Sequence, residues 1–321
     1  MRAGISALAD FSTVDRSGER VVGAVVPGLA LDLDPIERRL QLLEPALREC
    51  LASRTVEQVQ KIPLLLGLSE VDGPVSSSGM AEGILPAIEQ RLGARFLQEH
   101  SRAASLGRTA GLELLGEARV LIEEGVAPAC LICGVDSGVA TGALRWLEQR
   151  WRLRTSENAD GVIPGEAAAA VLLESTPSRA LARPVRVVGL GFAAEEATVM
   201  NEEPLLGLGL TQASKLALDE AGIEMHQIGF RISDLTGESY GFREQALVIG
   251  RLLRVHREEG YPLWHPSEYV GDTGAAAGVL QLAMAFHAYE GSYAPGKVAM
   301  CFTGTDRGRR AVALLASERA S

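Results

Sequence analysis

Ser239 has the strongest local pattern for nucleophilic chemistry. It lies in Gly237-Glu238-Ser239-Tyr240-Gly241, which matches the G-x-S-x-G turn of serine hydrolases. The chain order Ser239, Asp272, His287 is also the order of a hydrolase triad. However, the motif is short, the sequence has no HGGG-like oxyanion segment, and His287 lies inside an expected helix, where a packed role is the ordinary one. A serine hydrolase using Ser239 is therefore an alternative and not the leading interpretation.

Other reactive side chains give weaker signals. Ser105 follows His100 and is a second possible nucleophile, although capping of a loop is the ordinary role of such a serine. Cys130 and Cys133 form a C-x-x-C inside an expected strand, and no second Cys/His pair with metal spacing follows them. We interpret them as buried apolar cysteines and expect no metal site. No glycine pattern has dinucleotide-binding spacing, and we expect no cofactor.

An internal duplication positions these residues. An apolar helix beginning at Gly107 leads to a strand at 129–133 and then to a Gly-x-Asp-x-Gly turn at 134–138. The same order recurs from Gly271, through a strand at 298–302, to the turn 304–308. The helix starts are 164 residues apart, from 107 to 271, and the turns are 170 apart, from 134 to 304. Two similar halves are therefore expected, with residues 1–175 and 185–321 joined by a linker at 176–184.

Helical and strand patterns alternate through both halves, which predicts mainly parallel sheets covered by helices. In the first half, beyond the duplicated stretch, we expect helices at 35–50, 83–92 and 142–151, and strands at 21–26, 62–68, 95–99 and 167–174. In the second half we expect helices at 211–221, capped by Thr211, and 243–255, and strands at 185–190, 229–235 and 261–264. Duplication then suggests two packed sheets with helices between them, related by a pseudo-twofold axis.

Composition excludes several classes of partner. The 321 residues are 47% hydrophobic and 22% charged, with a net charge of -10, which is typical of a globular protein. No Lys/Arg-rich run is present to neutralise phosphates, so no nucleic-acid partner is expected. No segment is apolar enough for long enough to span a bilayer, and residues 1–6 lack the apolar stretch of a signal peptide, so a cytoplasmic location is expected.

Two segments resemble a known family. Residues 158–174, N-A-D-G-V-I-P-G-E-A-A-A-A-V-L-L-E, and residues 271–278, G-D-T-G-A-A-A-G, are similar to motifs of the β-ketoacyl synthases of the thiolase superfamily. The second resembles that family's G-H-T-x-G-A-A-G. The resemblance covers nearly the whole chain, which is shorter than most such synthases. It implies an α/β, thiolase-like fold of duplicated βαβαβ halves in a five-layered α-β-α-β-α arrangement.

The family's catalytic residues do not carry over. The resemblance places the nucleophilic cysteine's position at Arg108, the G-H-T histidine at Asp272, and the second histidine at Asp234. No catalytic residue is therefore expected at these degenerate positions, with Ser105 and Ser239 as alternative nucleophiles. A cation at a helix N-terminus opposes the helix dipole, so a buried Arg108 needs carboxylate partners. We hypothesise that Arg108, Asp234 and Asp272 form an ion cluster that fills the former active site; alternatively, the alignment is shifted and Arg108 lies on the surface.

The resemblance favours a catalytically inactive protein that acts as a binding or assembly partner. One form is a chain-length-factor-like subunit of a ketosynthase heterodimer, and the other is an adaptor or chaperone, for example for a type VI secretion effector. The alternative is an active acyltransferase of the 3-oxoacyl-[acyl-carrier-protein] synthase type. The family pairs through the strand before the nucleophile helix, which we place at about 94–100. The sequence leaves open a homodimer or a heterodimer, an acyl carrier protein or another client, and whether a substrate tunnel remains.

Overall fold

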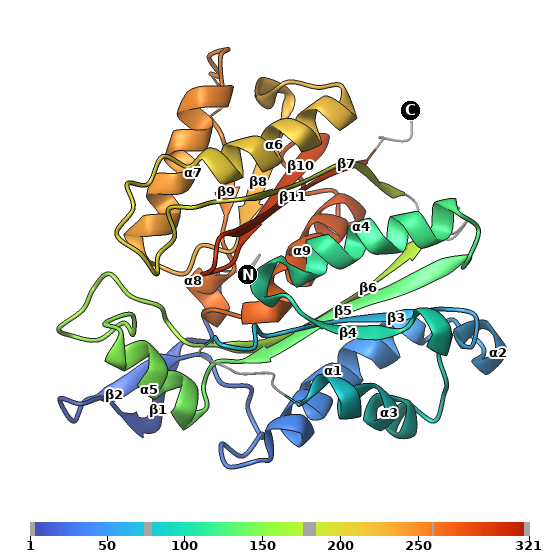
Figure 1. Cartoon of the computed structure of the whole chain (residues 1–321), viewed down its shortest axis with the longest axis horizontal. Coiled ribbons are helices and arrows are strands. Elements are labelled where there is room, and N and C mark those ends of the chain that lie inside the picture. Colours follow the sequence, from blue (N-terminus) through green and yellow to red (C-terminus); the bar gives the residue numbers. More distant parts are fainter. Residues whose placement is uncertain (1–3, 74–78, 176–183, 259, 318–321) are drawn as a thin grey trace.

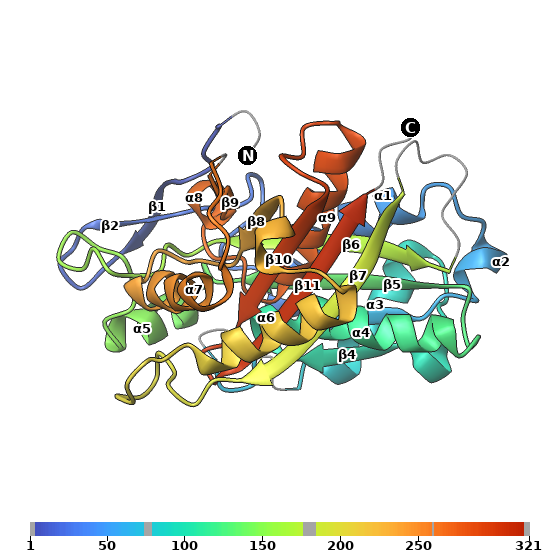
Figure 2. The same cartoon turned by 90° about the horizontal axis from the view of Figure 1, so that it is seen from above.

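The computed structural model describes residues 4–73, 79–175, 184–258 and 260–317. Two β-sheets lie on either side of a central pair of helices, and further helices cover the outer face of each sheet (Figure 1). Five layers therefore follow one another in the order α-β-α-β-α, and in the view from above the strands of one sheet run at an angle to those of the other (Figure 2). The expected α/β fold is confirmed.

Among the described residues, the N-terminal sheet has four strands. Its elements are α1 Pro35–Leu51, α2 Val56–Val59, β3 Leu64–Leu68, α3 Ala81–Leu92, β4 Arg102–Ser105, β5 Ala129–Ser137 and β6 Glu166–Glu174. The strand order is β4-β3-β5-β6, with β4, β3 and β5 parallel and β6 antiparallel to β5. Asp34 caps α1 by accepting hydrogen bonds from the backbone N–H groups of Ile36 and Glu37. The apolar faces of α1 and α3 then cover this sheet with residues such as Leu43 and Ile84.

The C-terminal sheet has five strands within the described ranges. Its elements are β7 Val185–Ala194, α6 Leu208–Ala221, β8 Phe230–Ser233, α7 Ser239–Leu252, β9 Leu263–Trp264, α8 Ser267–Val270, β10 Val298–Gly304 and β11 Arg309–Ser317. The order is β7-β11-β10-β8-β9, with β11 antiparallel to both of its neighbours. Helices α6 and α7 cover the outer face, where Ala213 and Val248 pack against Met300 and Phe302.

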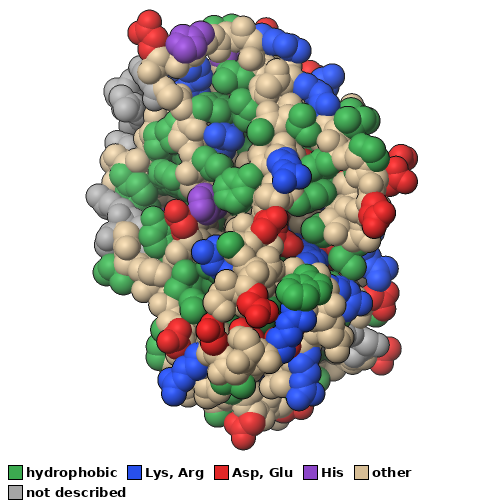
Figure 3. Space-filling view, turned by 90° about the vertical axis from the view of Figure 1, so that its left-hand side faces the viewer, with side chains coloured by type: hydrophobic (Ala, Val, Ile, Leu, Met, Phe, Trp, Pro, Cys, Tyr) green, Lys and Arg blue, Asp and Glu red, His purple; other side chains and the backbone are tan. Residues whose placement is uncertain are grey.

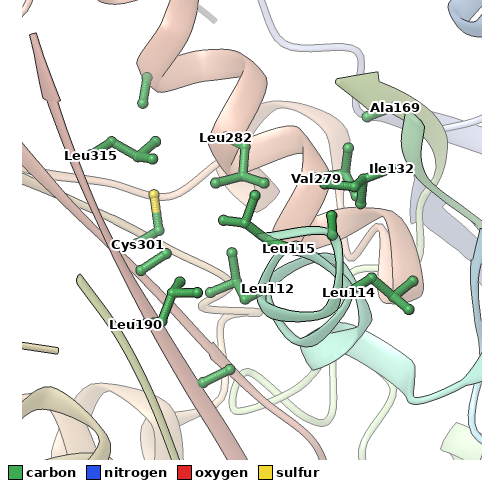
Figure 4. Close-up of a cluster of buried hydrophobic side chains, with 14 of the residues drawn as sticks. Leu112, Leu114, Leu115, Ile132, Ala169, Leu190, Val279, Leu282, Cys301 and Leu315 are labelled. Atoms are coloured by element: carbon green, nitrogen blue, oxygen red, sulfur yellow. The ribbon is translucent and has the colours of Figure 1, made fainter. Parts of the chain in front are cut away.

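The central layer consists of α4 Ala110–Glu123 and α9 Ala277–Glu290, the two helices of the duplicated stretch. They cross at a small-residue contact, where a Cβ on Gly111 would lie 2.4 Å from the backbone nitrogen of Val279. This close crossing brings the starts of the two helices together. Their side chains fill the space between the sheets (Figure 4), with contributions from Leu112, Leu114, Leu115, Val279 and Leu282 of the helices and Ile132, Ala169, Leu190, Cys301 and Leu315 of the strands.

A small flanking unit lies beside these layers. It contains the antiparallel hairpin of β1 Ala9–Val14 and β2 Arg20–Gly23, and α5 Thr141–Gln149. Val21, Leu144 and Leu147 form its own apolar cluster. The expected strand at 21–26 is thus a short hairpin strand outside the two main sheets.

Several expected boundaries are wrong. The strand expected at 95–99 lies at β4 instead, because Phe96 packs into the α1–α3 cluster and donates its backbone N–H to the Glu89 carboxylate rather than to a neighbouring strand. Helix α6 begins at Leu208 after Gly207, and Thr211 is a buried residue within its first turns and not its cap. In the first half, residues 134–137 continue β5 and do not form a turn. The proposed linker falls almost entirely on residues 176–183, outside the described residues.

The molecular surface is of mixed charge. On the face in Figure 3, acidic and basic side chains are interspersed with apolar ones. Among the described residues, no helix is both long and apolar enough to cross a membrane.

Candidate functional site

The starts of α4 and α9 meet at an ion pair between Arg108 and Asp272. Arg108 lies in the 3₁₀ turn Gly107–Thr109 that leads into α4, and Asp272 lies two residues before the matching turn Gly274–Ala276. The Arg108 Nη2 donates to Asp272 Oδ2 at 2.6 Å, and its Nε donates to Asp272 Oδ1 at 3.2 Å. The Arg108 side chain is 13% exposed, so it is mostly buried, and the alternative that it lies on the surface is wrong.

The cluster extends through Asp306, which the sequence analysis did not assign as a partner. Asp306 lies in the turn between β10 and β11 and accepts a hydrogen bond from Arg108 Nη1 at 2.9 Å. Its other oxygen accepts from Arg152 Nη1 at 2.7 Å, and Arg152 is also held by both oxygens of Glu238 at 2.7 and 2.8 Å. Carboxylates and guanidinium groups therefore alternate along a chain of five side chains, which we call the ion cluster: Asp272, Arg108, Asp306, Arg152 and Glu238.

Asp306 and Asp136 occupy equivalent places in the two halves, and each contacts the helix start of the other half. Asp136, near the end of β5, accepts from the backbone N–H of Ala275, in the turn before α9, at 3.0 Å. Asp306, after β10, binds Arg108, in the turn before α4. The Asp136 carboxylate also accepts from Ser69 Oγ at 2.7 Å. The repeated Gly-x-Asp-x-Gly pattern is thus a reciprocal link across the pseudo-twofold axis.

The ion pairs outweigh the cost of burial for three members of the cluster. Burial alone raises the pKa of Asp306, but Arg108 and Arg152 hold it well below its ordinary value. Burial alone lowers the pKa of Arg108, but Asp272 and Asp306 raise it above that of a free arginine. Burial acts in the same way on Arg152, and its bonds to Glu238 and Asp306 raise its pKa. Arg108, Arg152 and Asp306 are therefore ionised at neutral pH.

Asp234 lies close to the cluster but is not bonded to Arg108 as hypothesised. Its carboxylate accepts from the backbone N–H of Gly304 at 2.8 Å, and no ion pair joins it to Arg108 among the described residues. Burial raises the pKa of Asp234 to about 6, against the opposing influence of Arg108. Asp306 therefore takes the place beside Arg108 that the sequence analysis gave to Asp234.

Two small cavities lie beside the cluster among the described residues. One of about 60 Å³ is lined by Arg108, Arg152 and Asp234, among others. A second of about 50 Å³ lies on the other side of Arg108, between Glu70 and Asp136. Both are lined by Arg108 and Asp306, so these side chains form the wall between the two cavities. Each has room for a few water molecules and not for a long acyl chain.

Within the part of the chain that the structure describes, Ser239 is not joined to Asp272 or His287. Ser239 begins α7, and its Oγ donates to Asp160 Oδ2 at 2.7 Å. His287 lies ten residues beyond the start of α9, about 15 Å along the helix axis, whereas Asp272 precedes that helix. A catalytic triad requires a Ser–His and a His–Asp hydrogen bond, and the side chains of Ser239, Asp272 and His287 do not form this series. Ser105 ends β4, paired in register with Leu68, and lines neither of the two cavities.

The described residues also include the side-chain types that bind metal ions, namely His, Cys, Asp and Glu. Among the described residues, no group of three or more His, Cys, Asp or Glu side chains is arranged to hold a metal ion.

Solved structures share this architecture over nearly the whole chain. The chain is similar to a complex described as "AntDE:AntF (apo): type II PKS acyl-carrier protein in complex with its ketosynthase bound to the hexaketide", with a TM-score of 0.76 and 14% identity over 98% of this chain and 92% of that one. The fold is that of the ketosynthases. "The ishigamide ketosynthase/chain length factor" matches with a TM-score of 0.73 and 16% identity over 98% and 93% of the two chains. No family model and no curated protein matches the sequence.

A third solved structure has the same fold. A β-ketoacyl synthase from Burkholderia phymatum STM815 matches with a TM-score of 0.72 and 16% identity, over 99% of this chain and 93% of that one. Identities this low show a common fold and leave the activity of this chain open.

Sequence reasoning missed three members of the ion cluster. Asp306 was visible as the repeat of Asp136, but its partner is set by the crossing of the two halves. Arg152 and Glu238 come from loops that follow α5 and β8, and no spacing in the sequence connects them. A buried arginine's need for more than one carboxylate was the signal that was available.

Proposed function

We propose that this chain is a ketosynthase-fold protein that binds a partner and does not itself catalyse condensation. The observation that carries this proposal is the place of Arg108 between Asp272 and Asp306, where the starts of α4 and α9 meet. A guanidinium whose pKa is raised stays protonated and has no lone pair for attack on a thioester. Arg108 acts here as a structural cation.

The size of the remaining space supports the same proposal. The cavities of about 60 and 50 Å³ on the two sides of Arg108 leave no room for an acyl chain beside it. Asp234 and Asp272 serve the cluster and its surroundings by accepting backbone and guanidinium hydrogen bonds. Arg108 and Asp272 therefore join the two halves, and Asp234 is held beside them by Gly304 of its own half.

A subunit of a dimer is the binding role that we propose. Strand β4 lies at the end of its sheet and pairs only with β3 among the described strands, so its other edge is open to a mate. Two of the similar structures are described as complexes of a ketosynthase with a chain length factor. By analogy, we propose a chain-length-factor-like subunit that pairs with a related chain. The adaptor role beside a type VI secretion effector stays a prediction of the sequence.

Two measurements test the two parts of this proposal. Malonyl-loaded acyl carrier protein should lose carbon dioxide no faster with the protein than with buffer, because no residue of the site replaces the nucleophile and histidines that the family uses. Light scattering after size exclusion should show a dimer, alone or after co-expression with a ketosynthase. Decarboxylation at an enzymatic rate would refute the first part, and a persistent monomer in both preparations would refute the second.

A further inference from the structure

As far as the structure describes the chain, the two sheets have the same strand arrangement except that one has a fifth strand. In the C-terminal half, β9, β8 and β10 are parallel, β11 is antiparallel to β10, and β7 covers the far edge of β11. In the N-terminal half, β4, β3 and β5 are parallel and β6 is antiparallel to β5, but no described strand covers the far edge of β6. The fifth strand of this sheet is missing from the described residues.

The uncovered strand is correspondingly less buried than its equivalent. Seven of the nine residues of β11 are buried, but only two of the nine residues of β6 are. Both strands are apolar, with the sequences Arg-Arg-Ala-Val-Ala-Leu-Leu-Ala-Ser and Glu-Ala-Ala-Ala-Ala-Val-Leu-Leu-Glu. The difference in burial therefore follows from the missing neighbour and not from polarity.

The backbone of β6 also has unpaired groups on this side. Leu131 of β5 donates its N–H to Pro63, beside β3, so the alternate residues of β5 point toward β6. These alternate residues include Ile132, which is opposite Val171. The N–H and C=O groups of Ala168, Ala170 and Leu172 then point away from β5, and within the described chain they meet no other backbone group. Unpaired edges of this kind accept added strands.

A large apolar groove runs along this edge. Its volume is about 1470 Å³, far larger than the cavities at the ion cluster, and it shares no lining residue with that cluster. Its walls come from β6, from the end of α1 at Ala46 and Cys50, and from α9 at Ala283 and Met284. The carboxylates in its lining are those of Glu49, Glu268 and Glu290, and among the described residues no lysine or arginine lines it.

We propose that this groove binds a β-strand donated by a second polypeptide, antiparallel to β6 as β7 is to β11. Strand β7 shows what such a strand must look like, because it solves the same packing problem in the other half. It is ten residues long, and its Gly189 and Gly191 lie so close to α6 that a Cβ would be 2.2 Å from the Ala217 carbonyl oxygen and 1.9 Å from that of Ala213.

Helix α1 holds the place in the first half that α6 holds in the second, since each is the last long helix before the first central parallel strand of its sheet. The donated strand should therefore carry small residues on the side that faces α1 and apolar residues on the side that faces α9. A basic residue near either end would meet the acidic rim of the groove. This interface is separate from the β4 edge, so it does not depend on the proposed dimer.

The direct test uses a synthetic copy of residues 185–194, Val-Arg-Val-Val-Gly-Leu-Gly-Phe-Ala-Ala, added to the whole protein. Amide hydrogen exchange is then measured across β6. Exchange at Ala168, Ala170 and Leu172 should slow by at least about tenfold, because free edge amides become hydrogen-bonded. A control peptide with proline at its fourth and fifth positions should give no slowing, because two adjacent prolines remove at least one donor that faces β6 in either register.

A tethered version removes the dependence on affinity. The backbone N–H of Ala7 donates to the carbonyl of Tyr269, a groove-lining residue, so residue 7 lies beside the groove. Fusing the same peptide ahead of residue 1 through a flexible Gly/Ser linker gives a millimolar effective concentration. The fusion should protect the same three amides and slow alkylation of Cys50, and the proline fusion should do neither. Equal exchange in the two fusions, or slow exchange at these amides without any peptide, would overturn the proposal.

Discussion

Replacing Arg108 with alanine should destabilise the fold strongly at neutral pH. The side chains of Arg108, Asp272 and Asp306 are 13%, 15% and 13% exposed, so their ion pairs belong to the mostly buried class. Removing one partner of such a group leaves uncompensated buried charge and costs about 3–5 kcal/mol. Here the loss leaves Asp272 without its arginine partner, whereas Asp306 keeps its ion pair with Arg152. The folding equilibrium constant should fall by about two to three and a half decades.

Urea unfolding at pH 7, followed by tryptophan fluorescence, measures this loss. Arg307→Ala is the matched control, because Arg307 pairs with Asp72 on the surface, where the two side chains are 58% and 66% exposed. An exposed pair of this kind contributes about 0–1 kcal/mol. The loss of stability in Arg108→Lys should lie between those of the two alanine variants, because lysine keeps the charge but lacks the forked guanidinium that bonds to both carboxylates.

The pH dependence gives a second test of the same reasoning. The pKa of Asp306 is lower in the folded protein than in the unfolded chain, so its contribution is present above about pH 4 and is lost as the pH falls toward the folded pKa. Without Arg108 the pKa of Asp306 is higher, so this carboxylate is protonated at a higher pH in the variant than in the parent and loses its buried charge first. The stability difference between the parent and Arg108→Ala should therefore shrink from pH 7 to pH 3. A loss below about 1 kcal/mol at pH 7, equal to that of the surface control, would refute the reasoning.

Three further predictions concern the packing and the titration of other groups. Gly111→Ala should lower the free energy of unfolding by about 2–3 kcal/mol, because a Cβ there lies 2.4 Å from the α9 backbone. Gly250→Ala, with open space around it in α7, should raise the free energy of unfolding by about 0.5–1 kcal/mol, and urea unfolding compares the two variants. The pKa of Asp234 is raised to about 6 in the folded protein, so the parent loses stability as the pH rises through that value. The free energy of unfolding of Asp234→Asn, measured by heat or urea, should therefore increase relative to that of the parent between pH 4 and 7, by up to about 3 kcal/mol. A difference that does not depend on pH would contradict this. Cys50 is half-buried, and burial raises its pKa to about 11. Iodoacetamide at pH 7.5 should therefore alkylate Cys50 alone and slowly, and the other three cysteines should react only after unfolding, as measured by intact mass. Rapid labelling of more than one cysteine would be inconsistent with their buried positions.

The central layer was predictable because the duplication fixes it. Two glycine-opened apolar helices, each followed by an apolar strand, had to occupy equivalent places, and α4 and α9 do so. Arg108 and Asp272, 164 residues apart, were expected to meet for the same reason, and they are joined by two hydrogen bonds. Periodicity and internal repetition carry this information in the residues themselves.

The remaining partners could not be predicted, because they depend on how the halves cross. Asp234 was chosen as the third member because the resemblance aligns it with the family's second histidine, but its carboxylate accepts from the backbone N–H of Gly304. Asp306 reaches Arg108 because the turn after β10 lies over the start of α4. The position of β4 was missed for a local reason: Ala103 and Ala104 have weak strand propensity, whereas Phe96 is apolar and buried in a loop.

The most direct test of the central claim is the intact mass of the protein after incubation with acyl-CoA and malonyl-loaded acyl carrier protein. Because Arg108 holds the nucleophile's place in the ion cluster, the mass should remain that of the unmodified chain. Variants Ser105→Ala and Ser239→Ala are measured in parallel. An acyl adduct on the parent chain, lost in either variant, would contradict the account and identify the serine as a catalytic nucleophile.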